Sequence, residues 1–325
     1  MRTVVVPMIV ISSLIIGAVF SPPVDNPRVT STFGEFRALG MRGPHFHMGV
    51  DFSTALSEGK PVYAAADGYL VRLEIDTDDI YGYTLVLDHE NGYRSLYAHM
   101  SSFSPKLKEI VEDLKREFGD QRIVVEFPTK SIYFRKGEIV GFSGKTGEAT
   151  WPHVHFEVRD ESEKISIDPL PLMSEVKRPV DEEIVVEKIS VNGRKYTFSN
   201  GGIYSFTGDY PKIELLAYSV GNANRLGLKS LTLFLDGEKV YSVVFDEIAW
   251  SNFNDVWKVY GKDSVMNEYS FKPWYLLYPN GESNLVKLNL LSKNKFKSGI
   301  INARIELVDV WGMMKTLEFK LRKVR

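Results

Sequence analysis

Short apolar runs that alternate with turn signals dominate residues 26–172 and most constrain the fold. Within each run, apolar and polar side chains alternate and β-branched and aromatic residues are frequent, which indicates strands rather than helices. Glycines separate the runs at short spacings that favour antiparallel hairpins. The strands predicted in this way cover residues 61–66, 69–75, 83–87 and 93–98. This region is therefore expected to form an antiparallel β-sheet.

One segment departs from the alternating pattern. Apolar side chains recur there at helical spacing, with lysine and glutamate filling most of the other positions, at Leu107, Ile110, Val111, Leu114 and Phe118. This spacing predicts a single amphipathic helix. A helix that covers one end of the sheet is the simpler interpretation, and a helix that shapes the rim of a cleft is the alternative.

A second group of strands follows a predicted linker. Residues 173–185 are charged, contain Pro179 and lack periodicity, as expected of a linker. Beyond them, Asn192-Gly193 and Asp236-Gly237 each separate alternating apolar runs, which is a strong hairpin signal. Further strands are predicted at residues 213–218, 230–235, 240–245 and 302–308.

The 325 residues exceed the usual size of a single hydrophobic core, so two domains are expected. We predict a mainly β protein. Residues 25–172 would form an antiparallel β-sheet domain with one inserted amphipathic helix. Residues 186–325 would form a β-sandwich of immunoglobulin-like type.

Residues 1–24 have the layout of an export signal. Arg2 precedes an apolar run from Val4 to Phe20 that carries no charged side chain and is short for a membrane span. The residues after the run offer no clean cleavage site, so an uncleaved membrane anchor through residues 4–20 is one alternative and a buried core segment is another. Export to the periplasm or cell envelope is expected.

Charge and cysteine content exclude several classes of function. The 40 basic and 42 acidic side chains are interspersed and give a net charge of -2, whereas nucleic-acid binding requires a concentrated positive face. The chain has no cysteine, which excludes disulfides, thiolate nucleophiles and cysteine-bound zinc. Neither a His-Glu-x-x-His motif nor a Gly-x-Ser-x-Gly elbow occurs. Any metal must therefore be bound by His, Asp or Glu.

The histidines suggest where such a metal would bind. On a strand, His153 and His155 would project from the same face, about 6.6 Å apart at Cα. Asp51 follows His47 by four residues, about 13 Å in an extended chain. That distance is too long for two ligands of one zinc ion, whose bonds are about 2.1 Å. The segment must therefore bend, and Gly49 permits the bend.

The two pairs of residues predict a metal site better together than separately. His47, Asp51 and His155 could supply three ligands and leave a fourth position open, as in catalytic zinc sites. His99 and His153 would then lie nearby without a ligand role, and an imidazole with a pKa near 6.5 is suited to proton transfer. A structural zinc is the weaker alternative, because such sites normally use four protein ligands.

Four blocks resemble the lysostaphin-type, or LytM-like, zinc peptidases, which cut peptide cross-links in bacterial peptidoglycan. Residues 47–52 match the His-x-Gly-x-Asp block, and residues 91–99 match the strand that ends in Tyr-x-His. Residues 136–147 resemble the glycine-rich hairpin, and residues 152–158 match the His-x-His block. The resemblance covers residues 28–172.

The resemblance implies that His47, Asp51 and His155 bind one Zn2+ per chain and that His99 and His153 are catalytic. It implies a zinc-dependent endopeptidase that hydrolyses peptide cross-links of peptidoglycan. The alternative is a non-catalytic envelope regulator that activates another cell-wall hydrolase. Such relatives usually lack a metal ligand, whereas the set here is complete.

Some features do not follow the family pattern. Trp151 stands where the family commonly has glycine, and the inserted helix lengthens the chain between His99 and Gly137. His45 and His89 match no family role, and a surface or strand-end position is expected for His89. The C-terminal domain contains tryptophans that could stack on sugars, but core packing is more common, so a structural or positioning role is expected. These tryptophans are Trp250, Trp257, Trp274 and Trp311.

Overall fold

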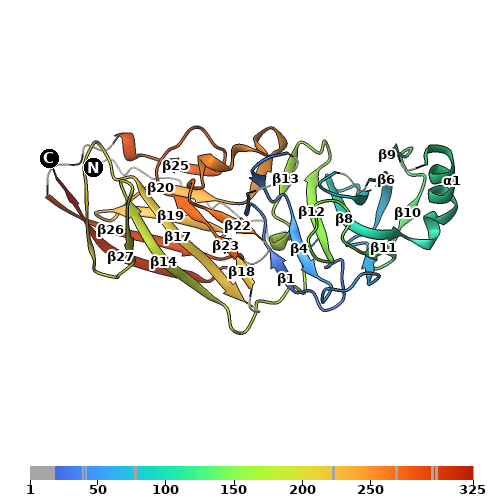
Figure 1. Ribbon diagram of the computed structural model, residues 1–325, viewed down its shortest axis with the longest axis horizontal. Helices are drawn as coiled ribbons and strands as arrows, with labels where there is room; N and C mark the ends of the chain where they lie inside the picture. Colours follow the sequence, from blue (N-terminus) through green and yellow to red (C-terminus); the bar gives the residue numbers. More distant parts are fainter. Residues whose placement is uncertain are drawn as a thin grey trace, which may run out of the picture.

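The computed structural model of the chain describes residues 19–38, 40, 42–76, 79–119, 121–221, 224–267, 270–293, 296 and 299–324. Over these residues the protein consists mostly of strands in antiparallel sheets, with one α-helix, which confirms the predicted mainly β class. Figure 1 shows the N-terminal strands at one end of the elongated molecule and the C-terminal strands at the other.

The N-terminal half is built on a sheet of twelve strands whose pairs are all antiparallel. Its main path contains β1 (Val29–Ser31), β4 (Val50–Ser53), β12 (His153–Asp160), β8 (Tyr93–Phe103), β7 (Tyr83–Asp88), β6 (Gly68–Ile75) and β10 (Tyr133–Phe134). The other members are β5 (Pro61–Tyr63), β9 (Ile123–Glu126), β11 (Ile139–Ser143), β13 (Ile165–Ile167) and β21 (Glu247–Ala249). A separate two-stranded ribbon joins β2 (Phe36–Arg37) to β3 (His45–Phe46).

The predicted amphipathic helix is α1 (Lys108–Phe118), which follows the 3₁₀ turn η1 (Pro105–Leu107). Leu107 is fully buried, and the other apolar side chains of the stripe, apart from the exposed Phe118, pack half-buried against the core. The helix ends at Gly119, whose φ of 66° is in the region that favours glycine. In Figure 1 the helix covers the end of the sheet that is remote from the C-terminal strands.

The C-terminal half contains two larger sheets and a ribbon. One sheet contains β15 (Arg194–Thr197), β14 (Glu183–Val191), β17 (Ile213–Gly221), β18 (Asn224–Leu226) and β24 (Trp274–Leu276). The other contains β16 (Ile203–Phe206), β27 (Met314–Lys323), β26 (Gly299–Val308), β19 (Ser230–Leu235), β20 (Glu238–Val244) and β25 (Val286–Asn289). The ribbon joins β22 (Val265–Asn267) to β23 (Ser270–Lys272), and 3₁₀ turns occur at η2 (Leu170–Leu172), η3 (Trp250–Asn252), η4 (Asp255–Lys258) and η5 (Leu291–Lys293).

Both hairpins that were predicted from dipeptides are present. Asn192-Gly193 joins β14 to β15 and Asp236-Gly237 joins β19 to β20, with positive φ at all four residues. This is the conformation that two-residue hairpin turns require. The pairing of β16 with β27 is parallel and was not predicted. The immunoglobulin-like arrangement of this half stays a prediction.

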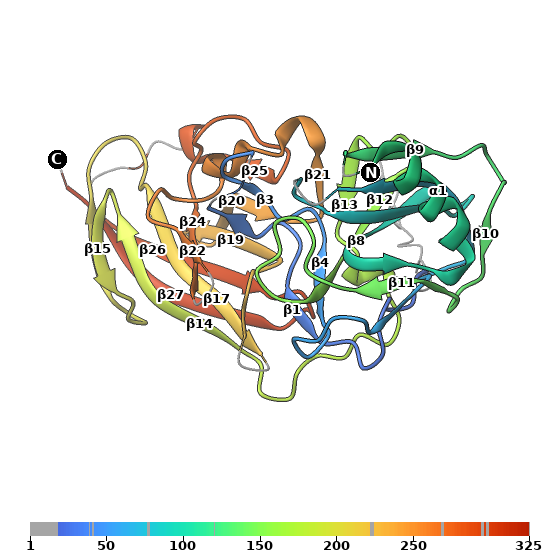
Figure 2. The same cartoon turned by 45° about the vertical axis from the view of Figure 1, so that its right-hand side comes forward.

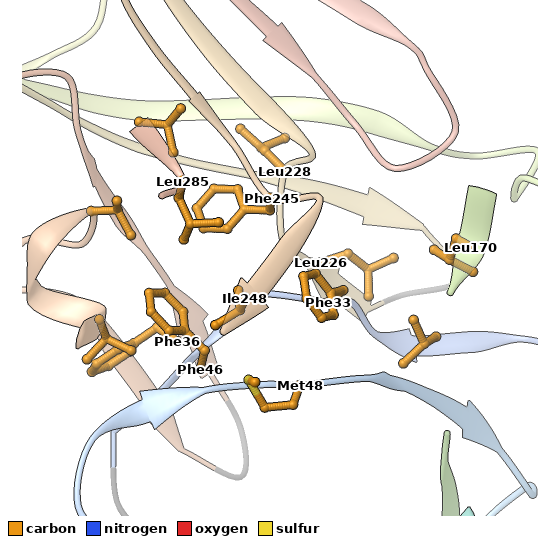
Figure 3. Close-up of a cluster of buried hydrophobic side chains, with 14 of the residues drawn as sticks. Phe33, Phe36, Phe46, Met48, Leu170, Leu226, Leu228, Phe245, Ile248 and Leu285 are labelled. Atoms are coloured by element: carbon orange, nitrogen blue, oxygen red, sulfur yellow. The ribbon is translucent and has the colours of Figure 1, made fainter. Parts of the chain in front are cut away.

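The two halves share one hydrophobic core. Figure 3 shows Phe33, Phe46 and Met48 from the N-terminal half packed together with Phe245 and Ile248 from the C-terminal half. Ile248 lies on β21, which pairs with β13 and so extends the N-terminal sheet, as Figure 2 shows. The C-terminal half is therefore packed into the fold of the N-terminal half. The predicted division at residues 173–185 stays a prediction, and the first strand beyond it begins at Glu183.

The export or anchor prediction for residues 4–20 falls almost entirely outside the described residues. The described part of the chain contains no helix that is both long and apolar enough to cross a bilayer. Phe20 is fully buried, and its backbone N–H donates to the carbonyl of Leu172 at 3.0 Å.

Two buried acidic side chains near the start of β14 predict a pH-dependent stability. Burial, together with the nearby Asp309 carboxylate, raises the pKa of Glu182 to about 7. Two contacts lower this pKa but do not offset the rise. Ser219 donates to Glu182 Oε1 at 2.7 Å, and the Arg178 guanidinium lies 3.8 Å from Oε2. The ordinary pKa of this group is 4.5. Between pH 4.5 and about 7, the folded protein therefore keeps a proton on Glu182 that the unfolded chain has lost. The stability that this proton contributes is complete below pH 4.5 and is lost as the pH rises through about 7.

Glu182→Gln should remove this pH dependence, because the amide resembles the protonated acid. Thermal unfolding at about pH 5 and about pH 8 checks it. The melting temperature of the variant should fall less between the two pH values than that of the wild type. An equal fall in both proteins would contradict the assignment.

Candidate metal centre

Strand pairing brings the three predicted ligands together. β4 pairs with β12 in a register that places Asp51 opposite His155. His47 lies on the short segment between β3 and β4, where the chain bends at Gly49 as predicted. A Cβ atom on Gly49 would lie 2.3 Å from the carbonyl oxygen of Phe156. Glycine is therefore required here mainly because the backbone of this segment approaches β12 closely.

The three ligand atoms lie within hydrogen-bonding distance of one another. Asp51 Oδ1 is 3.0 Å from His47 Nε2 and 3.0 Å from His155 Nδ1, and the two ring nitrogens are 2.9 Å apart. Both imidazoles are buried, and the side chain of Asp51 is 13% exposed. Among the described residues, these three form a group whose ligand atoms all lie within 4.8 Å of one another.

Each of the two imidazoles has an inner nitrogen, which faces Asp51, and an outer nitrogen, which faces away from it. The hydrogen bonds of the outer nitrogens fix the orientation of the rings. The carbonyl of Thr32 lies 2.9 Å from His47 Nδ1, and Glu157 Oε1 lies 2.9 Å from His155 Nε2. Both oxygens can only accept, so each outer nitrogen donates a proton and each inner nitrogen of a neutral ring presents a lone pair. Two lone pairs at 2.9 Å repel each other unless a cation lies between them. The donor set therefore fits a divalent metal ion with nitrogen and oxygen ligands.

The electrostatics of the group also favour positive charge. Burial opposes charging of His155, but hydrogen bonds and charge from Asp51 and Glu157 raise its pKa to about 9. Burial would raise the pKa of Asp51, yet the neighbouring imidazoles hold it well below its usual range. Asp51 is therefore an anion at neutral pH, and the site accommodates either a proton on His155 or a metal cation that replaces it.

His99 and His153 lie beside this group. Their ring centroids are 4.7 Å apart, and His99 is 5.7 Å from His155. His153 Nε2 lies 3.5 Å from Asp51 Oδ1, and the His153 side chain is 19% exposed, more than the other imidazoles of the site. The structure therefore brings all five residues predicted for the site into one cluster.

A single loop between β11 and β12 orients both of these histidines. His99 Nδ1 donates to the carbonyl of Thr146 at 2.8 Å, and His153 Nδ1 donates to the carbonyl of Trp151 at 2.7 Å. Each ring is left with an unprotonated Nε2 when it is neutral. Burial, with the neighbouring imidazoles, holds the pKa of His99 well below its usual range, so His99 is neutral.

The backbone around these histidines is unusual. His99 has a φ of 59°, within the long strand β8, at a bulge in the pairing with β7. A left-handed conformation at a non-glycine residue costs roughly 1–3 kcal/mol and is frequent at functional sites. Gly147 supports the loop that holds His99, since a Cβ there would lie 2.5 Å from the backbone nitrogen of Gly82.

The remaining histidines lie outside the cluster. His45 stacks on Phe253 with ring centroids 4.6 Å apart, and burial lowers its pKa to about 4. His89 directly follows β7, as predicted, but it is buried, with Nδ1 2.8 Å from the carbonyl of Asp67. Neither contributes an atom to the metal group.

Residues that surround His155 were not assigned a role from the sequence. Glu157 is fully buried, and its Oε1 also accepts from the Tyr81 hydroxyl at 2.6 Å. Its Oε2 accepts from Arg159 Nε at 2.6 Å. The alternation of β12 could have revealed Glu157 and Arg159, because both lie on the same strand face as His155. No sequence signal pointed to Tyr81.

One protein-family model matches part of the chain. Residues 45–114, which include His47, Asp51 and His99, match the model of Peptidase family M23. Residues 45–114 belong to a peptidase family M23 domain. The predicted resemblance to lysostaphin-type peptidases is thereby confirmed.

Relatives of the M23 domain share moderate identity with the chain. The DD-carboxypeptidase/endopeptidase Mpg of Neisseria meningitidis serogroup B is 29% identical over 144 residues, which are 44% of this chain and 27% of the relative. Lysostaphin of Staphylococcus simulans is 28% identical over 137 residues, which are 42% of this chain and 22% of the relative. The solved catalytic domain of that lysostaphin covers 45% of this chain and 91% of its own, with 27% identity and a TM-score of 0.32. The chain thus spans about a quarter of the length of these curated relatives.

Proposed function

We propose that the chain is a zinc-dependent endopeptidase that hydrolyses peptide cross-links of bacterial peptidoglycan. The observation that carries the proposal is the convergence of His47, Asp51 and His155, with two further imidazoles beside them. The relatives include proteins named as a DD-endopeptidase and as a glycyl-glycine endopeptidase. The proposal therefore concerns peptide cross-links as a class and assigns no particular bond.

In this proposal His47 Nε2, Asp51 Oδ1 and His155 Nδ1 bind one zinc ion. When bound, such an ion supplies Lewis acidity that polarises a carbonyl group and acidifies water. The two anions around His155, Asp51 and Glu157, offset the charge of the ion. The buried ligands keep their orientation through the Thr32 carbonyl and the Glu157 carboxylate.

His153 is the proposed proton carrier. Its Nε2 faces Asp51 and is unprotonated when the ring is neutral. The His153 ring is also the most accessible imidazole of the site. It can accept a proton from the attacking water and return it to the amine that leaves. His99 is neutral and more deeply buried. Its unprotonated Nε2 can only accept, so we assign it to a hydrogen bond that orients the attacking water.

Action on peptidoglycan places the protein in the cell envelope, reached by export through the N-terminal segment. We also propose residues 25–172 as the peptidase domain, to which β21 of the C-terminal half adds an edge strand.

The test is incubation of the zinc-loaded protein with purified peptidoglycan, followed by mass analysis of the released fragments. Wild type should release fragments with new amino termini, and His155→Ala should release none. Circular dichroism should show that the variant is folded. Equal release by both proteins, or no release by the wild type, would contradict the proposal, and the second result would leave a regulatory role as the explanation.

Trp151 is proposed to bind substrate beside His153. Trp151 is 51% exposed, and its carbonyl accepts a hydrogen bond from His153 Nδ1. Contact with the indole would remove apolar substrate surface from water, which contributes about 25 cal/mol per Å². Trp151→Ala should therefore raise KM for soluble peptidoglycan fragments about 3–10-fold, with kcat changed less. Trp151→Phe is the matched control and should retain most of the affinity. An unchanged KM in the alanine variant would contradict this role.

A further inference from the structure

One of the segments of the C-terminal half that lie near the metal centre pairs with β13. β21 lies antiparallel to β13, with Ile248 opposite Ser166, and the Trp250 backbone N–H donates to the carbonyl of Lys164 at 2.8 Å. The turn that follows, η3, carries Trp250 itself, and Phe253 comes directly after η3. We refer to residues 247–254 as the bridging segment.

From the metal centre outward, a chain of contacts leads to this segment. His155 Nε2 donates to Glu157 Oε1, and Arg159 Nε donates to Glu157 Oε2 at 2.6 Å. Arg159 also donates to Glu163 Oε2 at 3.0 Å. Glu157 is therefore held from two sides, and its orientation sets that of the His155 ring.

Trp250 covers one side of the ion pair that Arg159 forms with Glu157. The guanidinium carbon of Arg159 lies 4.5 Å from the centre of the Trp250 ring and 5.7 Å from that of Tyr81. The cation is therefore packed against two aromatic faces, an arrangement that is stronger where water is excluded. Arg159 is 7% exposed, and the Trp250 ring is one of the groups packed against it.

The same segment also fixes the chain just before His47. Trp250 stacks on Phe253, with ring centroids 5.2 Å apart, and Phe253 stacks on His45. The Phe46 backbone N–H donates to the carbonyl of Phe253 at 3.0 Å. Asn254 Nδ2 donates to the carbonyls of Arg42 and Pro44 at 2.8 and 2.9 Å.

We propose that the bridging segment positions two ligands of the metal centre and that Trp250 is its principal positioning residue. The Trp250 ring packs on Arg159, and Arg159 donates to Glu157, which accepts from His155. Phe253 and Asn254 accept from and donate to the backbone of the residues that precede His47. The proposal rests on the metal centre of the proposed function. It gives the C-terminal half a role inside the M23 domain, as a part of the site rather than as a separate appendage.

Loss of groups that orient metal ligands typically weakens metal binding about 10–100-fold. Trp250→Ala in the full chain should therefore raise the dissociation constant for zinc, measured by competition with a chelator, about 10-fold or more. Trp250→Phe keeps an aromatic face and should restore most of the affinity. The absorption spectrum of bound Co2+ should shift in the alanine variant and return in the phenylalanine variant, which a change in stability alone would not produce.

Trp311 is the matched control. It also lies in the C-terminal half, between β26 and β27, and like Trp250 it is partly buried with an indole N–H that has no partner within the described structure. Trp311→Ala should leave the zinc affinity and the Co2+ spectrum unchanged. If Trp250→Ala does not fold, Trp250→Leu, which keeps an apolar side chain but lacks the aromatic face, carries the test.

A folded alanine or leucine variant that binds zinc as tightly as the wild type would overturn the proposal. An equal loss of affinity in the Trp311 variant would also overturn it. Zinc binding by the wild type without peptide hydrolysis would contradict the proposed function and leave this positioning role intact. A wild type that binds no zinc would overturn both.

Discussion

Asp51→Asn is expected to abolish tight zinc binding and, with it, peptide hydrolysis. Asp51 Oδ1 lies 3.0 Å from each of the two ligand imidazoles, and Asp51 Oδ2 lies 3.6 Å from the Arg37 guanidinium. Asparagine keeps the size of the side chain but removes the anion that offsets the charge of the metal. The dissociation constant for zinc should therefore rise more than the roughly 10–100-fold that is typical when only an orienting group is lost.

Competition with a chelator and metal analysis of the dialysed protein measure this effect. Wild type should retain one zinc per chain and Asp51→Asn should retain none. Asp25→Asn is the matched control, because Asp25 is an exposed carboxylate that accepts a hydrogen bond from Tyr63 at 3.1 Å and lies outside the ligand group. Full zinc retention by the Asp51 variant would show that this carboxylate is not a ligand.

His153→Ala is expected to separate metal binding from catalysis. Its Nε2 lies 3.5 Å from Asp51 Oδ1, while its Nδ1 donates to the carbonyl of Trp151. Removal of a positioned general base typically lowers the rate about 10²–10⁴-fold. The turnover number on peptidoglycan fragments should fall by a factor in this range, whereas the zinc content should remain at one per chain.

The comparison of His153→Ala with Asp51→Asn makes this test specific. Both variants should lose activity, but only the Asp51 variant should lose the metal. His99→Ala should also retain zinc and should lose activity, because His99 is neutral and buried beside His153. A His153 variant that keeps its turnover within about tenfold of the wild type would remove this residue from the proton-transfer role.

The sequence predicted the elements whose signals are local. Alternation gave the strands, and Asn192-Gly193 and Asp236-Gly237 gave two hairpins that the structure contains. The helical spacing gave α1. For the site, His47 and Asp51 are close in the chain. His155 is 104 residues from Asp51, and both the need for a third ligand and the blocks that resemble a known family pointed to it. That pairing depends on the register of β4 with β12, which spacing alone does not determine.

The features that the sequence did not reveal depend on tertiary contacts. β21 is a three-residue strand, and its partner β13 lies about 80 residues earlier in the chain. No local sequence pattern indicates such a distant partner. The left-handed backbone of His99 follows from the bulge in β8 rather than from residue preference. The role of Trp250 depends on Arg159 lying beneath it, which only the assembled structure places there.

Anomalous diffraction from crystals of the zinc-loaded protein, recorded on both sides of the zinc absorption edge, tests the metal centre most directly. We expect one peak per chain, bonded at about 2.0–2.2 Å to His47 Nε2, Asp51 Oδ1 and His155 Nδ1, with His153 and His99 outside the coordination sphere. A peak bound by other residues, or no peak at these three side chains, would contradict the proposed metal centre.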